Sequence, residues 1–171
     1  MATTVTSSTL TVSVSESINL RGRQQGTSNT KRITGITNIA KTIITCLTAA
    51  EVSILGVNAA TSTDMGKSYL AGQYDEDDVR YLRITNLDDE NYVLLTMRTS
   101  GDTNAQEVAI KLDKGCSYIY SLDLDAGTEA TLWGSASAIN ASASTTIYNL
   151  IDIVGVANGG DVELEVFVAT V

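Results

Sequence analysis

The sequence predicts an all-β protein, an antiparallel β-sandwich with jelly-roll-like character and about nine short strands. Three observations lead to this fold class. Apolar and polar residues alternate over short stretches, clusters of Gly, Asn and Asp separate those stretches, and no stretch shows the period of an amphipathic helix. The 171 residues suit one domain with its own hydrophobic core.

The first element is the stretch TLTVSVSESINL at residues 9–20. Its alternation predicts a half-buried strand, with Glu16 as a bulge or as the exit from the sheet. The polar segment that follows, residues 21–29, predicts a loop. The apolar side of the strand consists of Leu10, Val12, Val14, Ile18 and Leu20.

Two further stretches predict strands before a long irregular segment. Residues 31–47, KRITGITNIAKTIITCL, are rich in Ile and Thr, which favours strands, with Gly35 as a bulge or corner. Residues 51–57 predict a short strand. Residues 58–76 are long for a loop in a compact domain, so we expect this segment to be functional or locally mobile.

The stretch DDVRYLRITNLDDENYVLL, residues 77–95, predicts a β-hairpin with acids at its entrance and at its turn. In its first strand we expect Val79, Tyr81 and Arg83 on the face opposite Leu82 and Ile84. In its second strand both faces are apolar, as they are in residues 147–156. A sandwich needs one apolar face per sheet, so a loop, an arm or another subunit must cover the second.

The remaining stretches also predict strands and turns. Residues 108–112 alternate and are followed by a turn at 113–115, after which alternation continues from Cys116 through Tyr118 and Tyr120 to Leu124. The stretch 127–144 is small and polar with Trp133, and a turn follows at 158–161. In the last strand we expect one face to carry Val162, Leu164, Val166 and Val168 and the other to carry Glu163 and Glu165.

Charge is unevenly distributed along the chain. Residues 1–47 carry five basic residues and one acid, a net charge of +4, and residues 48–171 carry six basic residues and nineteen acids, a net charge of −13. The total of −9 argues against a nucleic-acid partner. We expect residues 1–30 to form an N-terminal strand and basic arm, and residues 31–171 to form the sandwich body. The separation of charge suits an arm that docks on a neighbour, and it is equally compatible with ordinary solvated surface on both parts.

The composition excludes most catalytic chemistry. The chain has no histidine, so no Ser-His-Asp or Cys-His arrangement exists. We expect Cys46 and Cys116 to be two small buried hydrophobic residues in a reducing compartment, although the sequence is also compatible with a disulfide between them. No phosphate-binding or dinucleotide motif occurs. We therefore expect a protein that is not an enzyme and needs no cofactor.

Acidic residues gather in two places. Asp88 and Asp89 lie in the predicted turn, where Asp is a common turn former. Asp75, Asp77 and Asp78 are candidate calcium ligands because Ca²⁺ takes several carboxylate oxygens from loops, but no EF-hand spacing is present. Together with Trp133 they leave open a carbohydrate- or calcium-binding module.

Four stretches together resemble a known family. They are residues 9–20, the KRITGI strand at 31–36, the YLRITNLDDENYV segment within 79–93, and the KLDKGCSY segment at 111–118. This pattern is similar to small virion structural proteins of tailed bacteriophages, especially marine ones. The resemblance covers most of the chain and implies a non-enzymatic part of a virion.

The resemblance leaves open whether that part decorates the capsid, lies on the tail or joins a fibre. We expect a capsid decoration protein that binds the shell as an oligomer, or alternatively a tail or fibre-attachment protein. The implied partners are other virion proteins, the major capsid protein or tail proteins, and further copies of the chain. No apolar run approaches the length of a membrane span and no secretory signal is visible, so we expect synthesis in the host cytoplasm and no membrane or nucleic-acid partner. The candidate interface residues are Arg21, Arg23, Lys31, Arg32, Val79, Tyr81, Arg83, Asp88, Asp89, Tyr92 and Leu94.

Overall fold

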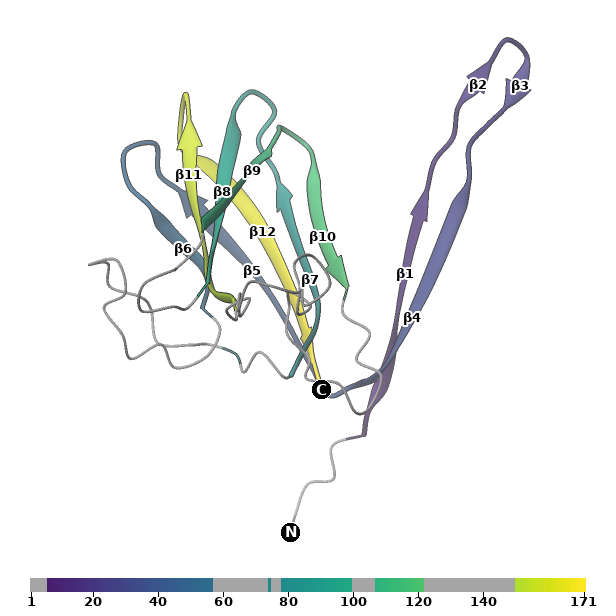
Figure 1. The fold of residues 1–171 in the computed structure, drawn as a ribbon, viewed down its shortest axis with the longest axis horizontal. Helices are drawn as coiled ribbons and strands as arrows, with labels where there is room; N and C mark the ends of the chain where they lie inside the picture. Colours follow the sequence, from purple (N-terminus) through teal and green to yellow (C-terminus); the bar gives the residue numbers. More distant parts are fainter. Residues whose placement is uncertain (1–5, 57–73, 75–77, 100–106, 122–149) are drawn as a thin grey trace, which may run out of the picture.

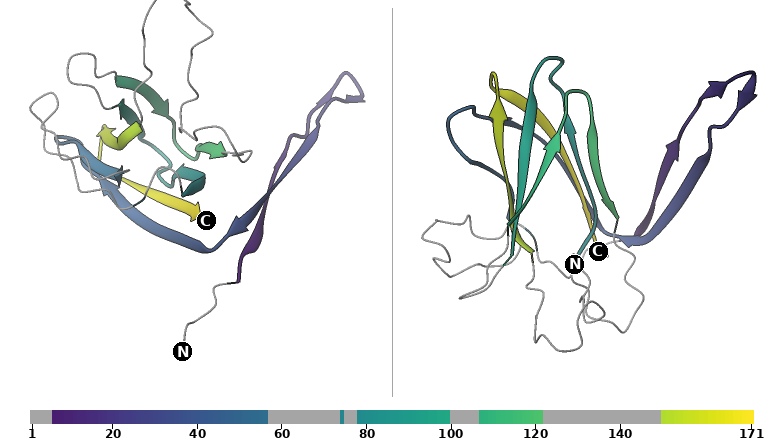
Figure 2. Two further views of the ribbon diagram at one scale, coloured as in Figure 1. Left: turned by 60° about the horizontal axis from the view of Figure 1, so that its bottom comes forward. Right: turned by 45° about the horizontal axis from the view of Figure 1, so that its top comes forward.

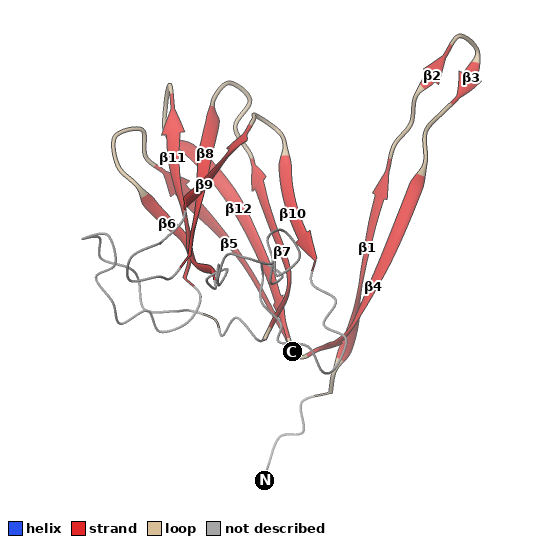
Figure 3. Cartoon of the chain, viewed as in Figure 1, coloured by secondary structure: helices blue, strands red, loops and turns tan. Residues whose placement is uncertain are grey.

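The computed structural model describes residues 6–56, 74, 78–99, 107–121 and 150–171. Within these ranges every regular element is a β-strand, so the all-β prediction is confirmed (Figure 3). Eight strands form a two-layer sandwich, and four more form a long ribbon that projects from it (Figure 1). The four strands of the ribbon bring the number above the nine expected.

Each layer of the sandwich is a four-stranded sheet in which all neighbours are antiparallel. The first, which we call the arm-side sheet, has the order β10 (Ser117–Ser121), β7 (Val79–Asn86), β12 (Val162–Thr170), β5 (Asn38–Cys46). The second, the far sheet, has the order β6 (Val52–Gly56), β11 (Leu150–Asn158), β8 (Tyr92–Thr99), β9 (Glu107–Leu112).

The pairing of the eight strands is nested. The first pairs with the last, β5 with β12, and inside that pair lie β6 with β11, β7 with β10, and β8 with β9. A long antiparallel hairpin that is rolled into two sheets has this order, which is the topology of a jelly roll. The predicted sandwich with jelly-roll character is therefore confirmed.

The predicted hairpin at residues 77–95 is wrong, because its two strands lie in different sheets. β7 belongs to the arm-side sheet and β8 to the far sheet, so the loop 87–91 is a β-arch between layers. Leu82 and Ile84 on β7 and Val93 and Leu95 on β8 are all fully buried. Their apolar faces meet across the core, where they bury more area than as neighbours in one sheet.

Three other short connections also cross between the sheets, including the turns expected at 113–115 and 158–161. Figures 1 and 2 show all four loops at one end of the sandwich, which we call the arch end. Hydrogen bonds join the loops: the Gly115 amide donates to the Asp88 carbonyl at 3.2 Å, and the Thr48 amide donates to the Asp161 carboxylate at 3.0 Å. The four loops are residues 47–51, 87–91, 113–116 and 159–161.

Two polar side chains shape the arch at 87–91. Asn86 is 1% exposed; its amide nitrogen donates to the carbonyls of Asn91 and Leu112, at 2.9 and 3.3 Å, and its amide oxygen accepts the Asp88 N–H at 2.9 Å. The Asp88 carboxylate in turn accepts the backbone N–H groups of Asn91 and Glu90, and these bonds lower its pKa. Asp88 is thus a turn former, as the sequence predicts.

The core between the sheets is closely packed around Gly155. A Cβ at this position would lie 2.7 Å from both Cys46 Sγ and Ile54 Cδ1, so only glycine fits there. Cys46 is fully buried, as expected, and burial raises the pKa of its thiol to about 11. Cys116 is exposed at the arch end, which corrects the expectation of a buried residue, and both cysteines are free.

A β-bulge changes the direction of Val79. On β12, Ala169 pairs with Tyr81 and the next residue, Thr170, pairs with Val79, so Arg80 is the extra residue. The bulge turns Val79 into the core, where it is 0% exposed, while Tyr81 faces the other side of the sheet. The expectation that Val79 shares a face with Tyr81 and contributes to an interface is therefore wrong.

The ribbon, which we call the arm, spans residues 8–36. It contains β1 (Ser8–Ser15) paired with β4 (Ser28–Ile36), and β2 (Asn19–Leu20) paired with β3 (Arg23–Gln24) near the tip. Arg21 and Gly22 form its turn, both with positive φ, as in a type I′ hairpin. The turn is thus shorter than the loop expected over 21–29. β1 ends at Ser15, which makes Glu16 the exit from the regular pairing.

The arm is far more exposed than its alternation predicts. Val14, Ile18 and Leu20 are 49%, 53% and 51% exposed, because beyond its base the arm diverges from the sandwich (Figures 1 and 2). The predicted half-buried strand is therefore wrong for the distal half. Gly35 has φ 81° where the β1–β4 register slips by one residue, which confirms the bulge expected there.

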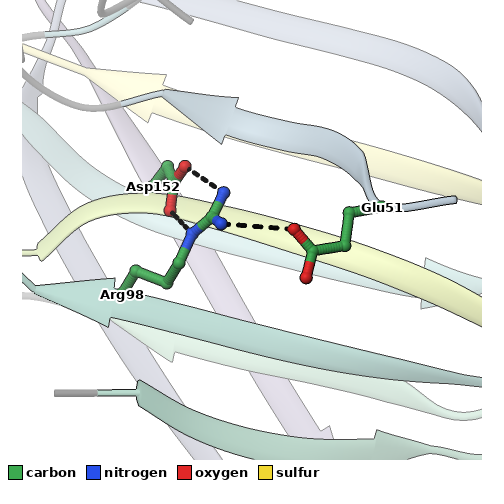
Figure 4. A network of polar contacts seen from close by, with 3 residues as sticks. All are labelled: Glu51, Arg98 and Asp152. Atoms are coloured by element: carbon green, nitrogen blue, oxygen red, sulfur yellow. Dashed lines mark hydrogen bonds and ion pairs between the residues drawn. The ribbon is translucent and has the colours of Figure 1, made fainter. Parts of the chain in front are cut away.

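A buried ion pair lies on the second face of the far sheet (Figure 4). Arg98 on β8 and Asp152 on β11 are direct cross-strand partners, and the guanidinium donates two hydrogen bonds to the carboxylate, at 2.7 and 2.6 Å. Their side chains are 5% and 1% exposed. Glu51, which is 45% exposed, approaches Arg98 at 3.3 Å. Asp152 interrupts the stretch expected to be apolar on both faces, and its paired geometry offsets the cost of burying a charge.

We predict that Asp152→Asn lowers the free energy of unfolding by about 3–5 kcal/mol, because the buried Arg98 guanidinium loses the charged carboxylate that accepts two of its hydrogen bonds. Urea denaturation measures the effect. Glu51→Gln, which removes the exposed carboxylate, should cost less than about 1 kcal/mol, and the double variant Arg98→Met/Asp152→Leu should recover most of the loss. Equal effects of Asp152→Asn and Glu51→Gln would contradict this prediction.

We also predict that Asn86→Ala lowers the free energy of unfolding by about 2 kcal/mol, because three hydrogen bonds between its side chain and buried or partly buried backbone groups of the arch are lost. Asp89→Ala is the matched control, since Asp89 is exposed in the same loop; it should change stability by no more than about 0.5 kcal/mol. Thermal or urea unfolding of the two variants side by side checks the difference.

Candidate interaction surface

The base of the arm packs on the outer face of the arm-side sheet. Ile33 and Ile36 of β4 are buried together with Tyr81 of β7 and Ala169 of β12. Leu10, Val12 and Phe167 complete this second apolar cluster. The Thr37 amide donates to the Thr170 carbonyl at 2.9 Å, just where the chain passes from the arm into β5. The arm therefore leaves the body from a fixed base.

The registers place one row of side chains across the middle of this outer face. Ile119 pairs with Arg83, Arg83 with Phe167, and Phe167 with Lys41. The Arg83 guanidinium lies 5.6 Å from the centre of the Phe167 ring, and the Tyr81 ring meets Phe167 edge to face at 5.8 Å. These contacts hold Arg83 in place on the sheet.

Glu165 links the two cations of this row. Its carboxylate lies 2.7 Å from the Lys41 ammonium and also pairs with Arg83. The hydrogen bond and charge of Lys41, followed by those of Arg83, lower the pKa of Glu165. The middle of the outer face thus carries two basic groups and one shared acid.

A groove separates the arm from the outer face. Its narrow part, about 230 Å³, lies between Leu10 and Val12 of the arm and Tyr81, Ile119 and Phe167 of the sheet. A wider part of about 420 Å³ continues along the arm. We call both parts the arm groove. The wider part is lined by Val12, Val14, Glu16, Thr27, Asn29, Lys31 and Ile119.

The four predicted basic interface residues all lie on the arm and are exposed. Arg21 forms part of the tip turn, and Arg23 follows it in β3. On β4, Lys31 is the cross-strand partner of Val12 and lines the arm groove, whereas Arg32 pairs with Thr11 and takes the opposite face. The arm thus combines basic groups with the exposed apolar side chains of its distal half.

The other predicted interface residues lie elsewhere. Tyr81 is 5% exposed under the base of the arm, and Arg83 is half-buried beside the arm groove. Tyr92 and Leu94 lie on the far sheet, where the Lys111 ammonium sits 4.5 Å from the centre of the Tyr92 ring. Asp88 and Asp89 lie at the arch end, so the predicted residues do not form one patch.

Two residues that shape this surface, Phe167 and Ile119, are not among the predicted interface residues. The alternation of the last strand already puts Phe167 on the side of Glu163 and Glu165, away from the core. That signal marks an exposed aromatic residue, which is a feature of interfaces. Ile119, 42% exposed, lies out of phase with Tyr118 and Tyr120, which pack against the core as expected.

Among the calcium- and sugar-binding candidates, Asp78 lies within the described residues. Asp75, Asp77 and Trp133 lie outside the described residues, as does the loop 58–76 apart from Tyr74. Asp78 is exposed, and within the described ranges no group of three or more potential ligands could hold a metal ion. A cavity of about 330 Å³ near β5 and β6 has a mostly apolar lining, including Ala40, Ile44, Leu55 and Val168.

The part of the chain that the structure describes contains no helix able to cross a membrane. Comparisons with protein-family models, with curated proteins and with solved structures found no match to this chain. The features of this structure that bear on function are therefore the arm, the arm groove and the charges around them.

We predict that Glu165→Gln destabilises the protein at neutral pH and that its difference from the wild type shrinks in acid. The folded-state pKa of Glu165 is lowered, so its contribution is complete above the ordinary value of 4.5 and is lost as the pH falls through the lower folded-state value. Urea midpoints measured from pH 7 to pH 3 test this sign. Glu163→Gln, an exposed neighbour on β12, should have the smaller effect at pH 7; a gap that widens in acid would contradict the assignment.

Proposed function

We propose that the protein is a structural component of a tailed-phage virion, a capsid decoration protein that binds the shell as an oligomer. The observation that carries this proposal is the arm: a two-stranded ribbon with a basic tip and exposed apolar side chains, held at a fixed base on a jelly roll. An isolated two-stranded ribbon is marginally stable in water, so such an arm is best explained by a surface that receives it.

The fold class is compatible with this role without specifying it. Jelly rolls occur in viral capsid proteins, but also in lectins and cupins. The resemblance of residues 9–20, 31–36, 79–93 and 111–118 to small phage structural proteins favours the first of these classes. Many copies on a shell would also let weak contacts of each arm add up.

A tail or fibre-attachment role uses the same surface and is the alternative within the class. In both roles the arm contacts a neighbouring subunit in the virion and the sandwich supplies the rigid body. What differs is the partner, and the particle itself distinguishes the two. A binding module for sugars or calcium would instead require residues beyond the described ranges.

We predict that antibodies against the protein label particles purified from the virus that encodes it, and that particles lacking it regain it when the purified protein is added. Mass spectrometry of separated capsids and tails measures occupancy. Arg21→Glu/Arg23→Glu should reduce the affinity of rebinding about tenfold. An exposed charge pair contributes up to about 1 kcal/mol, and two such pairs together approach the roughly 1.4 kcal/mol of a tenfold change. Lys111→Glu/Lys114→Glu is the matched control, with the same change of charge away from the arm.

Label on tails alone would favour the tail alternative over capsid decoration. Absence of the protein from purified particles would refute a virion role altogether.

A further inference from the structure

The arm and the rest of the chain carry opposite charges. Residues 8–36 hold four basic residues and one acid, a net charge of +3, which leaves −12 on the remaining residues. Around the arch end, six acids in or beside the loops are exposed. They are Glu51, Asp89, Glu90, Asp113, Asp161 and Glu163.

The arm tip and the arch end lie toward the same end of the molecule (Figures 1 and 2). Both are remote from the base, where β4 passes into β5. The arm nevertheless diverges from its own body, so its basic tip is held away from these acids. An arm of a second copy that entered the arm groove in the same direction would bring Arg21 and Arg23 toward them.

The apolar side chains match in the same way. Ile18 and Leu20 on the arm are exposed by half of their surface. On the outer face of the arm-side sheet, Ile119, Ile39 and Ile43 are 42%, 53% and 61% exposed. The base of the arm covers only the part of this face around Tyr81 and Ala169. The remainder of the face carries Ile119 on one edge strand beside the arm groove and Ile39 and Ile43 on the other edge strand, with the row of Arg83, Phe167 and Lys41 between them.

We propose that two copies of this chain exchange arms, each arm lying along the outer face of the other copy's arm-side sheet and filling its arm groove, with the basic tip toward the acidic arch end. A second copy is the occupant because one chain supplies both complementary surfaces in equal number. A two-fold arrangement then satisfies both arms at once. This inference goes beyond the virion proposal and needs no virion partner.

The fixed base explains why the arm serves another copy. The cluster of Ile33, Ile36, Tyr81 and Ala169 is shared between the arm and the body, and the bulge at Gly35 directs the chain away from the sheet. Closing the arm onto its own body would require this cluster to be repacked. Exchange keeps the cluster intact and buries the exposed residues of two arms.

Light scattering of the purified full-length protein across a concentration series tests the proposal. We expect a dimer whose dissociation constant rises about tenfold in Arg21→Glu/Arg23→Glu and by at least as much in Ile18→Ser/Leu20→Ser. The control is Val108→Ser, a side chain of the far sheet that is 49% exposed; it should leave the dimer unchanged. Circular dichroism of each variant confirms that the sandwich is folded.

Reversing the charges of the arch end in one variant and of the arm tip in another gives a second, independent test of self-association. Asp89→Lys/Glu90→Lys should weaken self-association, and an equimolar mixture of this variant with Arg21→Glu/Arg23→Glu should recover the dimer, because each arm tip then meets an arch end of opposite charge. A monomer at all concentrations, or a dimer that is indifferent to every arm variant, would overturn the proposal. A dimer absent from virions would refute the virion role alone, and a monomer that binds particles would refute only the exchange of arms.

Discussion

The pairing of β12 between β5 and β7 is the constraint on which the rest of the structure depends. Residues 162–170 pair with residues 38–46 in continuous register and with β7 on the other side. The strand also fixes the corner from which the arm departs, through the bond from Thr37 to Thr170, and Val171 donates to the Asp78 carbonyl at 3.0 Å. Because partners more than one hundred residues apart must meet, closing the roll carries a large entropic cost and makes folding depend on distant contacts.

The arches have a consequence for the surface as well as for the core. Each arch takes the chain from one sheet to the other, so the inner faces of consecutive strands face each other and become fully buried. The loops that make this crossing need Asn, Asp and Gly, as Asn86, Asp88 and Gly159 illustrate. The four arches lie at the same end, so the turn chemistry of these loops also concentrates carboxylates there. The acidic arch end follows from the topology.

Alternation in the sequence predicted which residues face the core, but it could not predict which strands become neighbours. It placed Val162, Leu164, Val166 and Val168 correctly, and it identified Gly35 as a bulge. The alternation predicted a hairpin of β7 and β8. In sequence, two apolar strands joined by a short turn look the same whether they pair within one sheet or face each other from two sheets. One extra residue at Arg80 reversed the phase and turned Val79 into the core. The strand at residues 9–20 alternates as regularly as a sandwich strand, so no local signal showed that its distal half leaves the body.

The distribution of charge also limits which surfaces can meet. The body carries −12, so two bodies repel each other, and the basic residues along the arm disfavour indiscriminate pairing of its exposed strand edges. The one favourable combination is an arm on a body. In the proposed exchange of arms, salt would screen this selection at long range, whereas apolar contacts of Ile18, Leu20 and Ile119 would act only when the surfaces touch. Charge would thus select the partner surface, and the apolar side chains would hold it.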